Sequence, residues 1–205
     1  MTILRRWQNR KFENCAYQSN IDSFYKIFFH YLFITAAVLS IFYCSLMITS
    51  APLRDDERET IDRTIALLET KGFDREVFLL RHLTTFRGFS NWLNTLARNE
   101  NAFAATNFPF AVITLYPDFY TRAQDDTERA MILLHEARHL QGGNERDAYS
   151  YVWRNRQKLG WTQLSHGTTE SYITIGLLTR EATPELFTCP AKVWNDCTEN
   201  LYVRK

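Results

Sequence analysis

The sequence predicts a mainly α-helical domain with a small β element, preceded by one N-terminal transmembrane helix. A long apolar run near the N-terminus, at 27–48, predicts the transmembrane helix. Apolar residues recur at helical spacing through most of the remaining chain, and one short stretch, at 110–116, is rich in β-forming residues. The chain has 205 residues, 45% of them hydrophobic, so a packed core is expected. We therefore divide the chain into an N-terminal segment (1–26), a transmembrane signal-anchor (27–49) and an outer domain (50–205).

Residues 27–48, IFFHYLFITAAVLSIFYCSLMI, form the apolar run, in which only His30 could carry a charge near neutral pH. At about 1.5 Å per helical residue the run would extend about 33 Å, enough to cross the hydrocarbon core of a bilayer. A buried helix of a soluble protein is rarely apolar on every face over such a length. The polar lead is long and no A-x-A site follows the run, so we favour a retained anchor over a cleaved signal peptide.

The charges on the two sides of the apolar run have opposite signs. Basic residues precede it and acidic residues follow it: Arg5, Arg6, Arg10, Lys11 and Lys26 on one side, and Asp55, Asp56, Glu57 and Glu59 on the other. The side that is rich in Lys and Arg usually stays in the cytoplasm. We therefore expect a cytoplasmic N-terminus and a C-terminal domain that is periplasmic or extracellular.

The overall charge of the chain is close to zero. It has 24 Lys and Arg against 23 Asp and Glu, a formal net charge of +1. The sequence also lacks a basic stripe with interleaved aromatic residues, which a nucleic-acid-binding protein usually carries. We therefore expect a membrane contact through the anchor and no nucleic-acid partner.

The four cysteines are consistent with this topology. Cys15 would lie in the cytoplasm and Cys44 in the membrane, whereas Cys189 and Cys197 would lie in an oxidising compartment. The spacing of the last two, CPAKVWNDC, differs from the C-x₂-C of zinc ribbons. We expect Cys189 and Cys197 to form a disulfide that closes a short loop, with two free thiols as the alternative.

Two helices are expected at the start of the outer domain. The first has an N-cap at Asp55-Asp56 and stops at Lys71-Gly72. Its apolar face carries Ile61, Ile65 and Leu68. The second is capped by Asp74 and is broken or bent at Gly88. Its apolar face carries Val77, Leu80 and Leu83.

A short helix, a loop and a strand are expected next. Trp92, Leu93 and Leu96 have helical spacing. Residues 101–109 have a mixed composition and predict a loop. Residues 110–116, FAVITLY, are rich in β-forming residues and end at Pro-Asp, which predicts a strand.

Three further helices complete the prediction. Asp125 and Glu128 have the spacing of a capping box at the start of a central helix, and Gly142-Gly143 predicts its end. A helix capped by Asn144 should run to about Leu159-Gly160, and a last one should cover Thr169–Arg180.

The pattern His135-Glu136-Ala137-Arg138-His139 on the central helix is the strongest functional signal in the sequence. Four residues advance a helix by about 40° beyond one turn, so both histidines face the same way and can bind one ion. Zinc accepts imidazole nitrogen in a tetrahedral shell, and a catalytic zinc needs a third protein ligand and an open fourth position. Glu136 could take a proton from a zinc-bound water as that water attacks a carbonyl carbon, and deliver it to the leaving nitrogen.

An accidental HExxH is the simpler alternative, because the pattern fixes only three residue types. In that interpretation the two histidines belong to an ordinary amphipathic helix. The apolar residues of the helix indicate that it is partly buried: Met131, Leu133, Leu134 and Leu140. Buried histidines and a buried glutamate need polar partners, and a metal ion would provide one.

The stretch from ITLYPDFY through the HExxH helix to the acidic-Ala-Tyr segment resembles the zincin metallopeptidases, including small bacterial gluzincin-like and aspzincin-like ones. The resemblance covers roughly residues 110–152. It implies a zincin-like α+β fold, a catalytic Zn²⁺ ion and a peptide or protein substrate.

Two acidic residues are candidates for the third zinc ligand. The segment ERDAY at 145–149 resembles the gluzincin E-x-x-A-D segment, whose leading Glu binds zinc, so Glu145 is the first choice. Tyr149 stands where that family has an acidic residue, and the gap from His139 is shorter than in gluzincins. Asp147 is the alternative, by similarity to the aspzincin Asp before Ala-Tyr. Both also have a structural interpretation in the first turn of a helix, Glu145 through the helix dipole and Asp147 through a capping box.

A few other polar residues are candidates for supporting roles. His166, in a loop before the last helix, could stabilise an oxyanion. Tyr149 and Tyr172 could also donate a hydrogen bond to that oxyanion. His82 is expected to be structural. Arg138 is expected to point to solvent or to pair with an acid.

The leading hypothesis from the sequence is a membrane-anchored zinc metallopeptidase, a hydrolase of amide bonds outside the cytoplasmic membrane. His135 and His139, with Glu145 or Asp147, would bind Zn²⁺, and Glu136 would be the general base. Peptide bonds are the default substrate by family resemblance, with a cell-wall amide as an alternative. The rival hypothesis is a single-span membrane protein whose outer helical domain binds a partner without catalysis, with HExxH either accidental or a structural metal site.

Overall fold

The computed structural model describes residues 2–96, 103–190, 192 and 195–198, with side chains from residue 24 onward. This part of the chain is mainly helical and contains one three-stranded sheet. The chain separates into two units, Met1–Leu46 and Met47–Lys205, which we call the N-terminal and C-terminal units. The boundary lies a few residues before position 50, where the sequence places the start of the outer domain.

The N-terminal unit belongs to one long helix, α1 (Thr2–Thr49). Its Phe24–Thr49 part has a mean hydropathy of 2.1 and is long and apolar enough to cross a membrane. The prediction of an apolar helix over 27–49 is therefore confirmed, while the orientation of that helix stays a prediction. Cys44, on this helix, is a free and exposed thiol.

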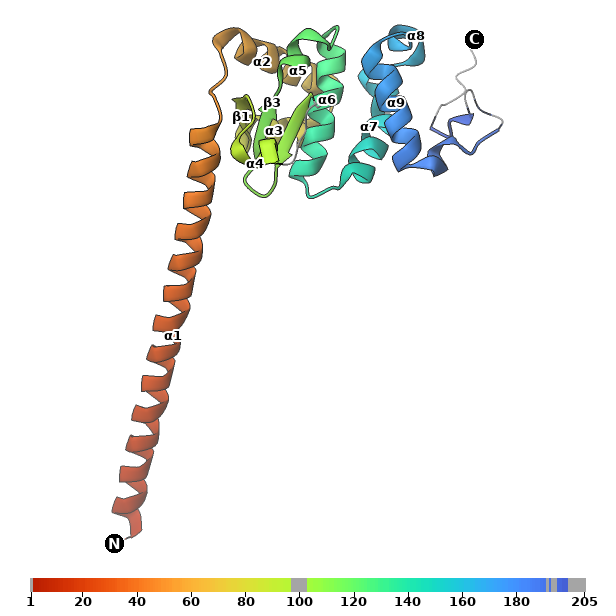
Figure 1. The fold of residues 1–205 in the computed structure, drawn as a ribbon. Coiled ribbons are helices and arrows are strands. Elements are labelled where there is room, and N and C mark those ends of the chain that lie inside the picture. The colour runs from red at the N-terminus through yellow and green to blue at the C-terminus, as the bar shows by residue number, and fades with distance from the viewer. Residues whose placement is uncertain (1, 97–102, 191, 193–194, 199–205) are drawn as a thin grey trace. The chain divides into compact units, whose positions relative to one another are not determined.

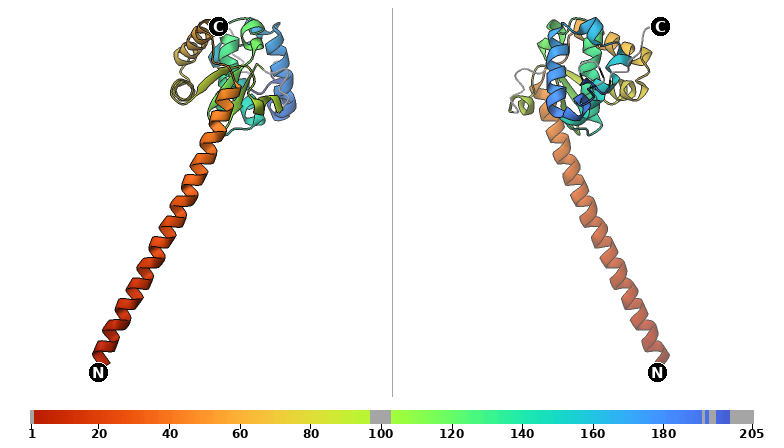
Figure 2. Two further views of the ribbon diagram at one scale, coloured as in Figure 1. Left: turned by 60° about the vertical axis from the view of Figure 1, so that its left-hand side comes forward. Right: turned by 90° about the vertical axis from the view of Figure 1, so that its right-hand side faces the viewer.

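The C-terminal unit contains the remaining elements. In chain order they are α2 (Asp55–Thr70), α3 (Asp74–His82), β1 (Thr85–Gly88), α4 (Trp92–Leu96), β2 (Ala104–Asn107), β3 (Val112–Leu115), α5 (Pro117–Thr121), α6 (Asp126–Leu140), α7 (Glu145–Leu159), α8 (Gln163–His166), α9 (Glu170–Ala182) and the 3-10 helix η1 (Pro184–Phe187). Helix α6 lies between the sheet and α7 (Figure 1). Both views in Figure 2 place α2 and α9 on opposite sides of this unit.

The sheet has the strand order β1-β3-β2. β1 runs parallel to β3, with Thr85 opposite Val112, and β2 runs antiparallel to it, with Ala104 opposite Leu115. All four residues of β3 are buried, as expected for a central strand with an apolar sequence. Within the described residues β2 pairs on one side only, so it is an edge strand.

The two outer strands correct the sequence prediction. The helix that was expected to reach Gly88 ends at His82, so 85–88 forms β1, and Leu83 is exposed instead of lying on an apolar face. The segment expected to be a loop, 101–109, contains β2, and its first two residues lie outside the described part of the chain. Both strands have four residues and no apolar alternation, so they depend on pairing with β3 and not on local propensity.

The helix boundaries follow the predicted caps closely. Asp55 and Asp74 are the first residues of α2 and α3, not their N-caps, which are Arg54 and Phe73. At the start of α6 the Asp125 side chain accepts from two backbone amides as predicted. The reciprocal bond of a capping box is absent there, because the Glu128 carboxyl accepts from the Gln124 amide, at 2.8 Å.

The core of the C-terminal unit lies where α2, α3 and the sheet meet α6, and it continues between α7 and α9. Its most deeply buried side chains include Leu68, Val112, Ile113, Leu115, Phe119, Met131, Leu133, Leu134 and Trp161. The core confirms the predicted apolar faces of α2 (Ile61, Ile65 and Leu68) and α6 (Met131, Leu133 and Leu134). Cys189 and Cys197 form a disulfide, as predicted.

Candidate metal centre

The turn at the end of α6 brings the start of α7 close to the two histidines of α6. Gly142 has φ of 79°, a conformation that favours glycine, and its amide donates to the His139 carbonyl at 2.9 Å. The Gly143 amide donates to the Arg138 carbonyl at 3.0 Å, which completes a Schellman motif. Asn144 then caps α7. The reversal is so tight that Glu145, in the first turn of α7, lies beside the last turn of α6.

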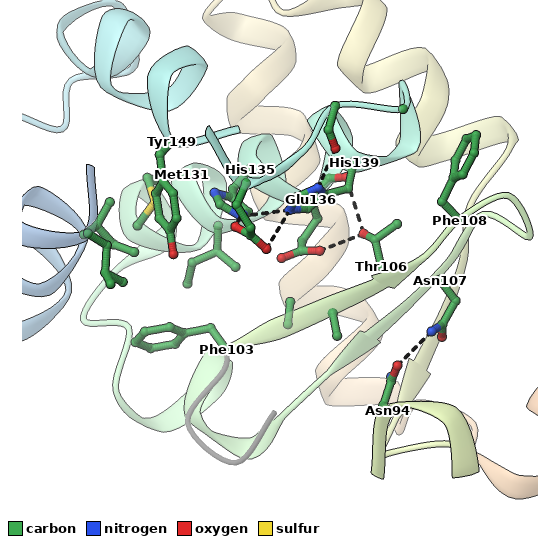
Figure 3. A pocket seen from close by; sticks show the side chains of 18 of the residues that line it. Asn94, Phe103, Thr106, Asn107, Phe108, Met131, His135, Glu136, His139 and Tyr149 are labelled. Atoms are coloured by element: carbon green, nitrogen blue, oxygen red, sulfur yellow. Dashed lines mark hydrogen bonds and ion pairs between the residues drawn. The ribbon is translucent and has the colours of Figure 1, made fainter. Parts of the chain in front are cut away.

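Three side chains converge at this turn. The two Nε2 atoms of His135 and His139 are 3.1 Å apart (Figure 3). The Glu145 carboxylate has Oε2 at 3.2 Å from the first of them and Oε1 at 3.4 Å from the second. Together the three residues form a group that could hold a metal ion. The structure therefore brings together the two histidines and the first-choice acid of the sequence analysis.

The triangle formed by these three side chains is compatible with a zinc ion. Ligand atoms at about 2.0–2.1 Å from zinc in a tetrahedral shell lie about 3.3–3.4 Å from one another. The two Nε2 atoms, 3.1 Å apart, are close to that value, and each lies near a different oxygen of the Glu145 carboxylate, at 3.2 and 3.4 Å. One ligand atom from each of the three residues lies within 4.8 Å of the others. The donor set, two imidazole nitrogens and one carboxylate oxygen, is also one that zinc accepts.

A further hydrogen bond orients His139. Its Nδ1 lies 2.8 Å from the Gly143 carbonyl oxygen, and because a carbonyl can only accept, Nδ1 carries the proton of this bond. In the neutral ring the lone pair is therefore on Nε2, which faces His135 and Glu145. Metal-binding histidines commonly donate their other ring nitrogen to a carbonyl or carboxylate in this way.

His139 and Glu145 stabilise each other's charged forms. Burial alone would lower the pKa of His139, but hydrogen bonds to Glu145 and Gly143 raise this pKa to about 9. Hydrogen bonds from His135 and then from His139 hold the pKa of the Glu145 carboxyl far below its usual range. The negative charge of Glu145 therefore favours a positive charge between these side chains.

Glu136 lies beside the triangle and points into the same space (Figure 3). Its side chain is buried, at 5% exposure, and its Oε2 accepts a hydrogen bond of 2.7 Å from the Thr106 hydroxyl on β2. This bond fixes the direction of one carboxylate oxygen relative to the edge strand. Glu136 is therefore held close to the candidate ligands without being one of the three.

Tyr149, one turn after Glu145 on α7, packs against His135. The centroids of the two rings are 4.7 Å apart. Its phenol projects toward the space in front of Glu136 (Figure 3). Burial and the negative charges of Glu145 and Glu136 raise the pKa of Tyr149 to about 12. The phenol therefore keeps its proton near neutral pH and can act as a hydrogen-bond donor.

A cavity of about 490 Å³ opens in front of these residues. Its lining includes the three candidate ligands, Glu136, Tyr149 and every residue of β2 from Ala104 to Asn107. The Glu145 side chain is 67% exposed, whereas those of His135 and His139 are 13% and 17% exposed. The group therefore has one covered side, on α6, and one side that faces the cavity.

The structure places the other candidates elsewhere. Asp147 belongs to the capping box of α7, where its Oδ2 accepts from the Asn144 amide at 3.3 Å. His166 lies in the short helix α8 and not in a loop, and its Nε2 contacts Asp125 Oδ2 at 3.1 Å. Tyr172 is buried against Trp153 and Trp161.

The two remaining side chains that the sequence singles out are His82 and Arg138. His82 is exposed, with its ring 5.1 Å from that of Phe78. Arg138 lies over the ring of Tyr151, 5.3 Å from its centroid, and donates to Gln141 at 3.1 Å.

Two contributors to the site are absent from the sequence analysis. Thr106 lies in the segment that was read as a loop, so nothing indicated that it would face Glu136. The Gly143 carbonyl belongs to the backbone and leaves no signal beyond the Gly142-Gly143 pair, which was read only as the end of a helix. The cluster therefore depends on contacts that appear only when the strand and the turn are in place.

The sequence matches no family model, and comparisons with the curated proteins and with the solved structures found no match.

Proposed function

We propose that the chain is a membrane-anchored zinc metallopeptidase that hydrolyses amide bonds outside the cytoplasmic membrane. The convergence of His135, His139 and Glu145 carries this proposal, because the two Nε2 atoms are 3.1 Å apart and a carboxylate oxygen lies within 3.4 Å of each, a donor set that zinc accepts. The buried carboxylate of Glu136 next to this group supports a catalytic rather than a purely structural site.

The chemistry assigns a role to each side chain. A zinc ion held by the three ligands would polarise a substrate carbonyl and lower the pKa of water toward 7. Glu136, held by Thr106, accepts a proton from the attacking water and returns it to the leaving nitrogen. Tyr149 donates a hydrogen bond to the oxygen of the carbonyl as negative charge develops there.

The edge strand that lines the cavity suits an extended peptide. β2 lines the cavity and is the edge of the sheet among the described residues. The backbone groups of an edge strand can pair with an added extended chain, which would lie across the candidate ligands. Peptide bonds are therefore the substrate that we favour over other amides.

The cellular placement follows from α1. Its apolar part, Phe24–Thr49, would anchor the chain in the membrane as a single span. The basic residues before it and the acidic ones after it favour a cytoplasmic N-terminus and a C-terminal unit outside the cytoplasm.

Zinc stoichiometry on the detergent-purified full chain tests the metal site. We expect about one zinc per wild-type chain, and loss of that zinc in His139→Ala and Glu145→Gln. Asp147→Asn is the matched control, an acid two residues away that should retain zinc because its carboxylate is used in a cap. A wild-type chain without zinc would leave the non-catalytic interaction domain as the better hypothesis.

Hydrolysis of a mixture of fluorescence-quenched peptides tests catalysis. Glu136→Gln should keep the zinc and lower the rate by about 10²–10⁴-fold, the usual contribution of a general base. Equal rates in the variant and the wild type, both loaded with zinc, would indicate a structural metal site.

A further inference from the structure

Three large apolar side chains are exposed between the end of β1 and the end of α4. They are Phe89, Trp92 and Leu96, with exposures of 68%, 40% and 74%, and we call them the apolar patch. Trp92 and Leu96 are four residues apart on α4 and therefore share one face of that helix. Exposed apolar side chains that are grouped in this way indicate an interaction site.

A buried asparagine network holds α4 against the sheet. The Asn91 amide donates to Asn107 at 2.7 Å, and the Asn107 amide donates to Asn94 at 2.8 Å. Asn94 in turn donates to the Thr114 hydroxyl on β3 at 3.0 Å. Figure 3 shows Asn107 pointing toward Asn94 from the end of β2. The network therefore fixes the position of α4, which carries Trp92 and Leu96.

The backbone at Phe89 gives an independent indication that the patch has a role. Phe89 has φ of 57°, in the left-handed region that bulky residues avoid. This conformation is strained, and the ring that it positions is mostly exposed, so packing inside the domain does not offset the strain. A surface that covers the ring would offset it.

The patch is joined to the residues at which the apolar helix ends. The Arg87 guanidinium donates to the carbonyls of Met47 and Ser50 at 2.9 and 2.6 Å. Gly88 and Ala51 exchange backbone hydrogen bonds of 2.9 and 3.0 Å, and the Trp92 amide donates to the Thr49 hydroxyl at 3.3 Å. Phe89 and Trp92 therefore lie within a few residues of the bonds that hold the end of α1 in the C-terminal unit.

We propose that the apolar patch docks the C-terminal unit on the lipid surface of the membrane in which α1 is anchored. Tryptophan and phenylalanine are favoured at the boundary between lipid headgroups and acyl chains. The end of the apolar helix must lie near that boundary, and the hydrogen bonds to Met47, Thr49 and Ser50 place the patch there. The proposal rests on the proposed membrane anchorage but does not require hydrolytic activity.

The docked patch would also define the substrate class, a consequence that rests on the proposed hydrolysis. Leu93 and Asn94, on the same helix as Trp92 and Leu96, contribute to the lining of the cavity. The cavity would then open close to the lipid surface. Its substrates would be extended segments of chains where they leave the membrane.

Spin labels on the full chain in lipid nanodiscs, one chain per disc, measure the docking directly. Cys15 and Cys44 are replaced by Ser, and a nitroxide is attached singly to Phe89→Cys or Leu96→Cys. Leu164→Cys on α8, where the native side chain is 88% exposed, is the control within the same unit. Leu39→Cys on α1 is the control for anchorage. The ratio of oxygen to charged nickel-complex accessibility reports contact with lipid at each position.

We expect that ratio at positions 89 and 96 to be at least about threefold higher than at 164, because lipid excludes charged solutes. Replacing Trp92 with Ala should lower the ratio at 96. A lipid signal at 39 with aqueous signals at 89 and 96 overturns the docking and leaves the anchorage intact. An aqueous signal at 39 overturns both. Aqueous signals with spin–spin broadening in discs that hold two chains overturn lipid docking in favour of a contact between copies.

Discussion

The two ends of α6 each hold a buried glutamate and a histidine, but the surroundings of these residues differ. At the N-terminal end, Glu128 is fully buried and accepts hydrogen bonds from the Gln124 amide and from the hydroxyls of Thr169 and Ser171. His166 precedes Thr169 in the chain by three residues, and its Nε2 lies 3.1 Å from Asp125 Oδ2. These polar groups connect α6 to the segment around α8 and the start of α9.

At the C-terminal end of α6 the polar groups converge. Glu136 accepts a hydrogen bond from Thr106 and otherwise faces the cavity. His135 and His139 direct their Nε2 atoms at each other and at one carboxylate, that of Glu145. The difference teaches that a histidine beside a carboxylate does not by itself indicate a site. Convergence of several ligand atoms on one point beside a cavity does.

The largest expected effect separates the histidines of the two ends. His139→Ala removes one of three ligands and should weaken zinc binding by at least about a hundredfold, since each ligand carries several kcal/mol of the binding free energy. His166→Ala should leave the zinc affinity unchanged. Competition with a fluorescent zinc chelator measures both. Equal losses of zinc affinity in the two variants would contradict the difference between the two ends of α6, because His166 would then act on the metal from the other end of the helix.

The two glutamates should differ in stability. Glu128→Gln replaces an acceptor for three donors in a fully buried position and should lower the free energy of unfolding by roughly 3 kcal/mol. Glu136→Gln loses at most part of one hydrogen bond beside a cavity and should cost less than about 1 kcal/mol. Urea unfolding of both metal-free variants, followed by near-ultraviolet circular dichroism, gives the two values. A larger cost for Glu136→Gln would mean that Glu136, and not Glu128, is the glutamate that stabilises the fold.

Two neighbouring glycines sharpen the comparison at the cavity end. A Cβ at Gly143 would lie 3.0 Å from the Arg138 carbonyl oxygen and 3.3 Å from the Asp147 Cβ, so Gly143→Ala must move the carbonyl that orients His139. We expect zinc affinity to fall about tenfold, as for other partners of metal-binding histidines.

Gly142→Ala is the control. A Cβ there would meet nothing within 4 Å, but φ of 79° makes the substitution strained. It should cost about 1 kcal/mol of stability and leave the zinc affinity unchanged. A tenfold loss of affinity in both variants would assign the effect to the turn as a whole and not to the Gly143 carbonyl.

Much of the fold could be predicted because its signals are local. The caps at Asp125 and Asn144 and the glycine pair after Leu140 fix where α6 and α7 begin and end. Buried residues at helical spacing, such as Ile61, Ile65 and Leu68, identify the packed face of α2. The two short outer strands carried no such signal, because their pairing with β3 supplies the energy that their sequences lack.

The candidate site could be predicted only in part, for the same physical reason. The spacing of His135 and His139 fixes their common face, and helix geometry alone brings them together. Choosing between Glu145 and Asp147 required the path of the turn, which brings the first acid to the histidines and leaves the second in the cap. Thr106 contacts a residue 30 positions away, and His166 one 41 positions away, so local patterns could not place them.

The smallest expected effect tests whether charge contributes at the N-terminal end of α6. Burial would raise the pKa of Asp125, but hydrogen bonds from the Glu128 amide and from His166 hold it below its ordinary value. A carboxyl whose pKa is lowered by folding stabilises the protein above its unfolded-state pKa, and this stabilisation is lost as the pH falls through the folded-state pKa.

Asp125→Asn keeps an N-cap acceptor and removes the charge, so it isolates this contribution. Because the Asp125 side chain is half exposed, we expect a cost below about 1 kcal/mol at pH 7. That cost should shrink as the pH is lowered from 7 toward 2, because the wild-type carboxyl loses its charge as the pH falls through its folded-state pKa. Urea unfolding at the two pH values measures it, with Asp56→Asn as the control at an exposed acid of α2. A cost that persists unchanged near pH 2 would mean that Asp125 acts through its shape and hydrogen bonds, and that no charge stabilises this end of the helix.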